Sequence, residues 1–78
     1  MQKLMFMSNQ TILYIQIDQI LYLISRNRKM FLKTLDKEYQ ISGTIKQYEY
    51  LYAYGFKRIS RNQIINYNVI TYIDKENV

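Results

Sequence analysis

Apolar residues between positions 4 and 41 occur in clusters of four or five, separated by short polar segments. The polar segments fall at 8–10, 18–19, 26–28 and 36–37. This spacing is typical of short strands joined by turns, because a helix would repeat its apolar positions every three or four residues. The pattern predicts strands over 3–7, 11–16, 20–26, 29–35 and 38–42.

The pattern becomes helical after Gly43. Thr44 and Gln47 fit a capping box, in which the Thr44 hydroxyl accepts the Gln47 amide proton and the Gln47 side chain returns to Thr44. Gly55 stands where a left-handed residue would end the helix. One amphipathic helix is therefore expected over 44–54. Its buried stripe is expected to contain Ile45, Tyr48, Leu51 and Tyr52.

The remaining segments complete a mainly β chain. Residues 56–59 and 63–65 are expected to be extended, the Asn-rich segment 66–68 to turn, and 71–73 to resume a strand. The chain has no Pro and two Gly among 78 residues, and it shows no linker or repeat. We therefore expect one α+β domain of small antiparallel sheets with one short helix.

Composition excludes most site chemistry. The chain has no His and no Cys, so it lacks the thiolate nucleophile, the imidazole base and the usual zinc ligands. It has no Gly-rich phosphate loop, and the spacing of Asp36 and Glu38 fits a turn residue followed by a strand residue. We expect no enzyme, no metal and no cofactor. The longest apolar run, 20–24, is far shorter than the roughly 18–20 residues of a bilayer span, so a cytoplasmic protein without a membrane partner is expected.

Positive charge concentrates in the middle of the chain. The formal net charge is +5, and residues 26–61 contain nine of the 11 Lys and Arg against three of the 6 Asp and Glu. Two clusters stand out, one at 26–29 in a predicted hairpin turn and one at 57–62 after the helix. Arg and Lys neutralise phosphates, and Asn, Arg and Lys at loop tips can read base edges. The alternative is that both clusters are solvated turns that keep a Tyr-rich domain soluble.

Seven of the 9 tyrosines fall into two groups. The first falls on faces expected to be buried, which favours core packing over a base-stacking platform. Tyr50 and Tyr54 lie off the apolar stripe of the helix, where exposed aromatics more often mark a protein partner. Together with Tyr72 in the last expected strand, they form a candidate partner surface. The tyrosines expected to be buried are Tyr14, Tyr39, Tyr48 and Tyr52.

Three segments, read in order, resemble the LytTR family, the DNA-binding domain at the C-terminus of many bacterial response regulators. Residues 15–23 resemble the opening strands of the family with their short acidic turn, and 34–46 resemble its hairpin leading into the single helix. Residues 55–66, GFKRISRNQIIN, are similar to the family signature. In that signature an aromatic, an Arg, a second basic residue and a terminal apolar-Asn pair follow the helix.

The resemblance implies an elongated sandwich of small antiparallel sheets that places loops, and no recognition helix, into successive major grooves of duplex DNA. By position, Asn27, Arg28 and Lys29 fall in a base-contacting loop, and Asn66 matches the family Asn. Ser60 falls where the family often has His. The expected phosphate contacts are Arg26, Lys57, Arg58, Arg61 and Asn62.

The sequence also departs from the family pattern. A family domain normally continues for about two further strands, which carry another base-contacting Arg, whereas this sequence ends at Val78. The resemblance therefore implies a single domain over 1–78 without the usual final strands and without a receiver domain. Two functions are expected. One is a transcription regulator that binds duplex DNA, on direct repeats or as a homodimer joined through the edge at 71–73. The alternative is a protein-binding modulator, an anti-activator that acts on another transcription regulator.

Overall fold

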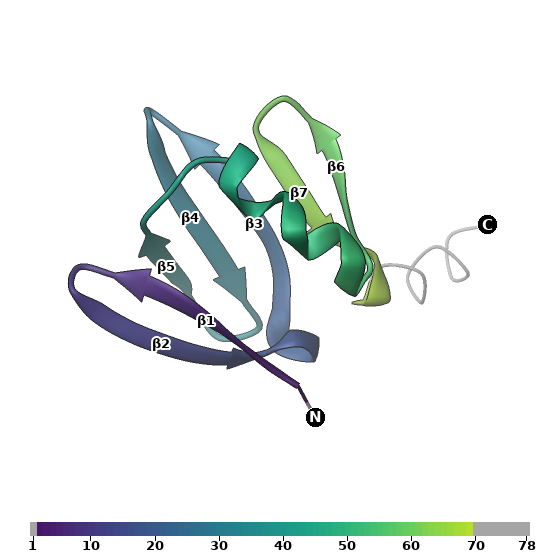
Figure 1. Cartoon of the computed structure of the whole chain (residues 1–78), viewed down its shortest axis with the longest axis horizontal. Helices are drawn as coiled ribbons and strands as arrows, with labels where there is room; N and C mark the ends of the chain where they lie inside the picture. Colours follow the sequence, from purple (N-terminus) through teal and green to yellow (C-terminus); the bar gives the residue numbers. More distant parts are fainter. Residues whose placement is uncertain (1, 70–78) are drawn as a thin grey trace.

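The computed structural model describes residues 2–69, which form two antiparallel sheets and one short helix (Figure 1). The first sheet is the hairpin of β1 (Lys3–Ser8) and β2 (Thr11–Gln16), and a single 3-10 turn, η1 (Ile17–Gln19), leads out of it. The second sheet has five strands in the order β5-β4-β3-β7-β6. Their bounds are β3 (Ile20–Arg26), β4 (Lys29–Thr34), β5 (Glu38–Ile41), β6 (Phe56–Ser60) and β7 (Gln63–Asn66), with the helix η2 (Lys46–Tyr54) between β5 and β6. The predicted fold class is confirmed.

The first five strands match the predicted ranges to within one residue. The prediction of these strands is accurate because tight turns separate the strands of two hairpins. Asn9 and Gln10 have φ of 48° and 66°, and Asn27 and Arg28 have φ of 50° and 65°. Two consecutive left-handed residues make a type I′ turn, whose twist matches that of the strands it joins.

The turn expected at 66–68 is wrong. Asn66 is the last residue of β7 and pairs with Phe56 of β6, and 67–69 are helical. The Asn66 oxygen accepts from the Asn68 amide, as in an Asx turn, but the Asn66 nitrogen bonds to the distant Ile17 carbonyl and keeps this residue in the strand. The strand expected at 71–73 lies outside the described residues.

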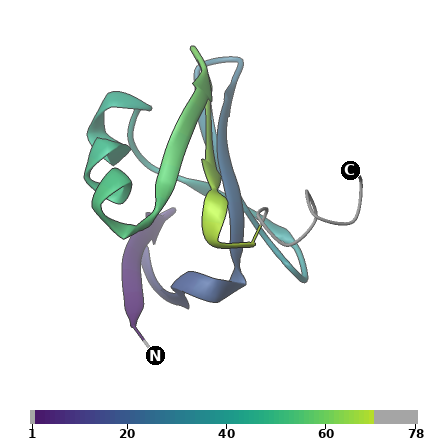
Figure 2. The same ribbon diagram turned by 90° about the vertical axis from the view of Figure 1, so that its right-hand side faces the viewer.

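The helix η2 and the β1–β2 hairpin cover the same face of the five-stranded sheet (Figure 2). The core lies between these two layers. The amide of Ser42, just after β5, donates to the Met7 carbonyl at 2.8 Å and fastens the hairpin to the sheet. The buried apolar side chains are Leu4, Phe6, Ile20, Leu23, Met30, Leu32, Ile41, Ile45, Tyr48, Leu51, Phe56 and Ile64.

The helix buries a different stripe from the one expected. It is a 3-10 helix of 9 residues, with three residues a turn, so positions i and i+3 eclipse each other. Tyr54 therefore follows Leu51 on the inner face and packs against the core, whereas Tyr52 is 40% exposed. The expectations for Tyr52 as a core residue and for Tyr54 as an exposed one are both wrong, because they assumed a period of 3.6.

The ends of η2 partly follow the sequence signals. The Gln47 side chain accepts a hydrogen bond from the Thr44 amide at 2.9 Å, as the capping box requires. The Gln47 amide bonds to the Thr44 carbonyl at 3.0 Å instead of to the hydroxyl, so only half of the box forms. Gly55 ends the helix with φ of 89°, as predicted.

Two other tyrosines on the expected inner faces differ in exposure. Tyr39 is partly buried against the core, as expected. Tyr14 is 65% exposed, so its expected burial is wrong. Side chains alternate between the two faces of β2, and Leu13 and Ile15 take the inner one.

Tyr48 provides a test of the core. Its hydroxyl donates to the Ser42 carbonyl, and its ring lies 6.0 Å from that of Phe6. Burial, together with neighbouring Tyr50, raises the pKa of Tyr48 from 10.0 to about 12.

Because this folded-state pKa lies above the unfolded one, we expect the Tyr48 contribution to stability to be complete below pH 10 and to fall as the pH approaches 12. Tyr48→Phe should lower the free energy of unfolding by about 1 kcal/mol at neutral pH and reduce the alkaline decline. Burial also raises the pKa of Tyr50, so a smaller alkaline decline in stability should remain in the Tyr48→Phe protein. Urea unfolding across this pH range tests the expectation, and parallel profiles for the two proteins would contradict it.

Candidate nucleic-acid interface

The two basic clusters of the sequence meet at one end of the five-stranded sheet. Strand β3 pairs antiparallel with both β4 and β7, so the β3–β4 and β6–β7 turns lie side by side (Figure 1). Two hydrogen bonds join them: the Ser25 amide donates to the Asn62 carbonyl at 2.8 Å, and the Asn62 side-chain amide donates to the Ser25 carbonyl at 3.2 Å. We call this surface the basic edge. It consists of Arg26, Asn27, Arg28 and Lys29 from the first turn and Arg58, Ser60, Arg61 and Asn62 from the second hairpin.

The β3–β4 turn holds its polar residues in two ways. Asn27, Arg28 and Lys29 are exposed at the tip, the first two in the left-handed conformation. Arg26 instead lies along the sheet, where its guanidinium forms an ion pair with Glu38 at 2.8 Å and stacks 4.4 Å above the Phe31 ring. The tip therefore presents its side chains outward, while Arg26 braces the base of the turn.

The β6–β7 hairpin is shaped by an irregularity. The register of the two strands shifts between Arg58 and Ser60, which leaves Ile59 without a strand partner and 47% exposed. Arg58 donates to the carbonyls of Ser60 and Arg61, and the Ser60 hydroxyl donates to the Asn62 side chain at 2.9 Å. Arg61 is exposed at the tip. The bulge therefore turns the basic side chains toward the end of the sheet.

Lys57 stands apart from the basic edge. It lies on β6 paired with Ile65, and its ammonium group sits 5.0 Å from the centre of the Tyr67 ring. The stem of Lys57 is exposed, so its charge adds to the same side of the molecule without reaching the loop tips.

Asn66 lies inside the protein, which corrects the prediction that it contacts a base. Its side chain is fully buried, and its amide nitrogen donates to the carbonyls of Ile17 at 3.0 Å and Ile20 at 2.8 Å. Its oxygen accepts from the Asn68 amide at 3.0 Å and from the Asn68 side chain at 2.9 Å. A side chain with both groups satisfied in the interior is structural. The sequence contains a signal for this burial in the apolar residues that directly precede Asn66. A residue that ends a buried strand can itself lie inside the protein.

The candidate partner surface is reduced by the fold. Tyr50 is 47% exposed, as expected, and lies against Tyr48 with ring centres 6.1 Å apart. Tyr54 is partly buried against the core, and Tyr72 lies outside the described residues. Tyr50 is therefore the one of the three that is exposed among the described residues.

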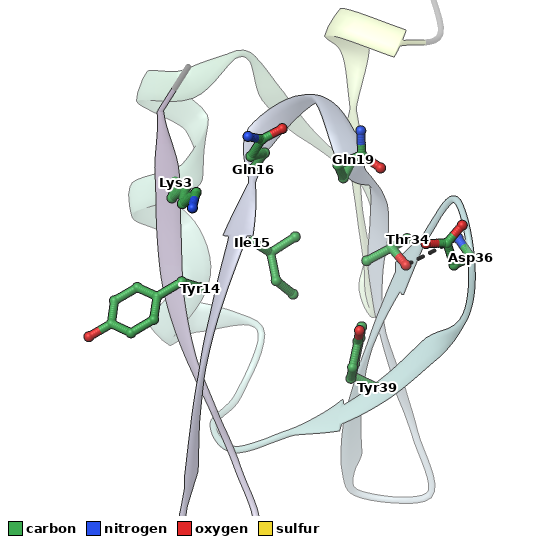
Figure 3. Close-up of a pocket in the computed structure, with 8 residues that line it drawn as sticks. All are labelled: Lys3, Tyr14, Ile15, Gln16, Gln19, Thr34, Asp36 and Tyr39. Atoms are coloured by element: carbon green, nitrogen blue, oxygen red, sulfur yellow. Dashed lines mark hydrogen bonds between the residues drawn. The ribbon is translucent and has the colours of Figure 1, made fainter.

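A shallow hollow of about 300 Å³ lies at the other end of the sheet, between β2 and the β4–β5 turn (Figure 3). Tyr14 and Tyr39 border it, and Lys3 and Asp36 give it one cation and one carboxylate. Opposite charges in one open hollow favour neither an anionic nor a cationic ligand. Anion binding is therefore expected at the basic edge instead.

Two further classes of site are absent from residues 2–69. No group of three or more Asp, Glu, His or Cys gathers there in a way that could hold a metal ion. No helix in that part of the chain is long and apolar enough to cross a bilayer.

Comparison with known proteins identifies relatives of this fold. The family model described as the LytTr DNA-binding domain matches residues 10–78. A solved structure, the LytTr DNA-binding domain of a Bacillus cereus protein described as a methyl-accepting/DNA response regulator, superposes with a TM-score of 0.70 at 17% sequence identity. The match covers 87% of this chain and 63% of that one, so this chain spans less than two thirds of its structural relative. No curated protein matches.

The structural role of Asn66 is testable. Asn66→Ala removes two buried hydrogen bonds, those from the Asn66 amide nitrogen to the Ile17 and Ile20 carbonyls, so we expect the free energy of unfolding to fall by about 2–4 kcal/mol. Asn66→Asp should also destabilise, because it places an oxygen against those carbonyls. Urea unfolding measures both. A variant of unchanged stability that lost its DNA sequence preference would instead make Asn66 a base contact.

Proposed function

Because this chain belongs to the LytTr DNA-binding domain family, we propose that it is a transcription regulator that binds duplex DNA through the basic edge. The observation that carries the proposal is the pair of hydrogen bonds between Ser25 and Asn62. They bring the two clusters together through a contact between residues 37 positions apart in the sequence. A surface assembled from both clusters can contact several phosphates at once.

The charge of the basic edge supports this partner. Arg28, Lys29, Arg58 and Arg61 are all exposed there. Within residues 2–69, the carboxylate that forms an ion pair at this surface is that of Glu38, and its partner is Arg26. Unneutralised cations on one side attract polyanions and release counterions when phosphates bind. We propose Arg61 and Arg58 as phosphate contacts.

The spacing of the two tips constrains the mode of binding. Neighbouring strands of a sheet are about 4.8 Å apart, so the centres of two adjacent hairpins lie roughly 10 Å apart. Successive major grooves on one side of the duplex are about 34 Å apart. The two tips would therefore address one groove and the backbone beside it. We propose that Asn27, Arg28 and Lys29 read base edges in that groove.

The alternative is a protein-binding modulator that acts on another regulator. Exposed Tyr50 beside the buried Tyr48 favours it, since exposed aromatics are enriched at protein interfaces. DNA binding is preferred because the basic edge contains five exposed cations, whereas the candidate partner surface has one exposed tyrosine among residues 2–69. A cytoplasmic location is part of the same proposal, because the protein would have to reach DNA.

Salt dependence tests the phosphate contacts. With roughly four contacts, the affinity for duplex DNA should fall about a hundredfold between about 50 and 200 mM salt, measured by fluorescence anisotropy. Arg61→Ala should weaken binding to all sequences and reduce the salt slope by about 1. Lys37→Ala is the matched control, because Lys37 lies in the β4–β5 turn at the opposite end of the sheet. Absence of binding at the lower salt concentration, or equal effects of the two variants, would contradict the proposal.

The type I′ turns of the β1–β2 and β3–β4 hairpins allow effects on protein stability to be separated from effects on DNA binding. Gly adopts positive φ without strain, so Arg28→Gly and Gln10→Gly should each raise the free energy of unfolding by about 0.5–1 kcal/mol. Only Arg28→Gly should weaken DNA binding, because Gln10 lies in the β1–β2 turn, away from the basic edge. Thermal unfolding and anisotropy measure the two effects. Equal DNA affinity for both variants would remove Arg28 from the interface.

A further inference from the structure

The β1–β2 hairpin is apolar on both of its faces. Its inner face places Leu4 and Phe6 in the core. Its other face carries two directly opposed pairs, Met5 with Tyr14 and Met7 with Ile12. These four side chains are 55%, 65%, 40% and 49% exposed, in that order. We call this surface the outer hairpin face.

An antiparallel sheet with one solvated face normally carries polar side chains there. The outer hairpin face does the reverse and gathers four of the eight large apolar side chains that are exposed among the described residues. Contiguous apolar patches of about 300–600 Å² on a soluble protein often mark an interaction site. Strand β1, which supplies Met5 and Met7, precedes the residues matched by the family model. Half of this face therefore comes from residues outside the family match, and its exposed apolar side chains indicate a binding partner.

Charge identifies that occupant. No charged residue occurs from position 4 to position 17, and Lys3 lies at the end of the outer hairpin face, opposite Gln16. Two copies of a protein with a net charge of +5 repel each other over most of their surfaces, but not across this face. An acidic partner or DNA would find almost no cation here. A second copy of the same chain meets no charge within these four side chains, and the two charged residues that border the face beside Tyr14, Lys3 and Asp36, have opposite signs.

We propose that a second copy of this chain docks on the outer hairpin face, so that two hairpins pack face to face about a two-fold axis. Sheets packed in this way are about 10 Å apart, and each copy contributes the same patch to the contact. The hairpin lies at the opposite end of the molecule from the β3–β4 and β6–β7 tips (Figures 1 and 2). The basic edges of both copies therefore stay accessible in the dimer.

The size of the face determines the strength of the dimer. Four half-exposed side chains from each copy bury on the order of 800 Å² in total, below the roughly 1,200–2,000 Å² of stable complexes. The dimer is therefore reversible, with a dissociation constant on the order of 10 µM to 1 mM. It forms without DNA, so it stands or falls separately from the proposed function.

Sedimentation equilibrium without DNA, over protein concentrations from about 10 µM to 1 mM, tests the dimer. The wild-type chain should show a reversible monomer–dimer equilibrium. Ile12→Lys should weaken association at least tenfold, because it places like charges at the contact of identical copies. Leu35→Lys is the matched control: it adds the same charge at a side chain 58% exposed in the β4–β5 turn, and it should change association little.

A mixing experiment tests the identity of the partner. Ile12→Glu alone should also weaken association, and an equimolar mixture of the Ile12→Lys and Ile12→Glu chains should associate more tightly than either alone. Met7→Thr, which retains strand propensity, provides a second variant, and circular dichroism checks that each chain is folded. A wild-type chain that is monomeric at the highest concentration overturns the proposal. So does equal weakening by Leu35→Lys, or a mixture that associates no better than its components.

Discussion

The fold depends on one buried amide. Asn66 ends β7 in the interior, where its nitrogen donates to the carbonyls of Ile17 and Ile20 and its oxygen accepts two hydrogen bonds from Asn68. Asn68 in turn donates to the Tyr54 carbonyl at 2.8 Å, at the end of η2. A buried polar side chain is tolerated only when its groups are satisfied. All of these groups are satisfied, so Asn66 joins the end of β7 to the start of β3, and Asn68 connects this junction to the end of the helix.

This junction determines where the charged loops lie. It holds β7 against β3, and β3 also pairs with β4, so the two hairpins that carry the basic clusters end at the same edge. The Ser25–Asn62 hydrogen bonds then close the gap between their tips. The residues to which the family resemblance assigned DNA contacts therefore divide into two groups. Asn66 and Asn62 build the scaffold, and Arg28, Lys29 and Arg61 are displayed on it.

The molecule separates its charge from its apolar surface. The basic edge occupies one end of the five-stranded sheet, and the β1–β2 hairpin, which has no charged residue from position 4 to position 17, lies at the other (Figure 2). The two proposed contacts, with DNA at the basic edge and with a second copy at the outer hairpin face, therefore use opposite ends of the molecule and do not obstruct each other.

The sequence by itself determined the class of fold, the first five strands and the helix-ending Gly55, because alternation, turn residues and left-handed glycine are local properties. It also located both basic clusters. Only the tertiary structure decided that these clusters meet, since the Ser25–Asn62 contact joins residues distant in the chain. Tertiary packing also drew η2 into a three-residue period, which exchanged the environments of Tyr52 and Tyr54, and it buried Asn66 in a network of long-range hydrogen bonds. A local pattern records which side chains can be buried or charged, but partners far along the chain decide which of them remain exposed.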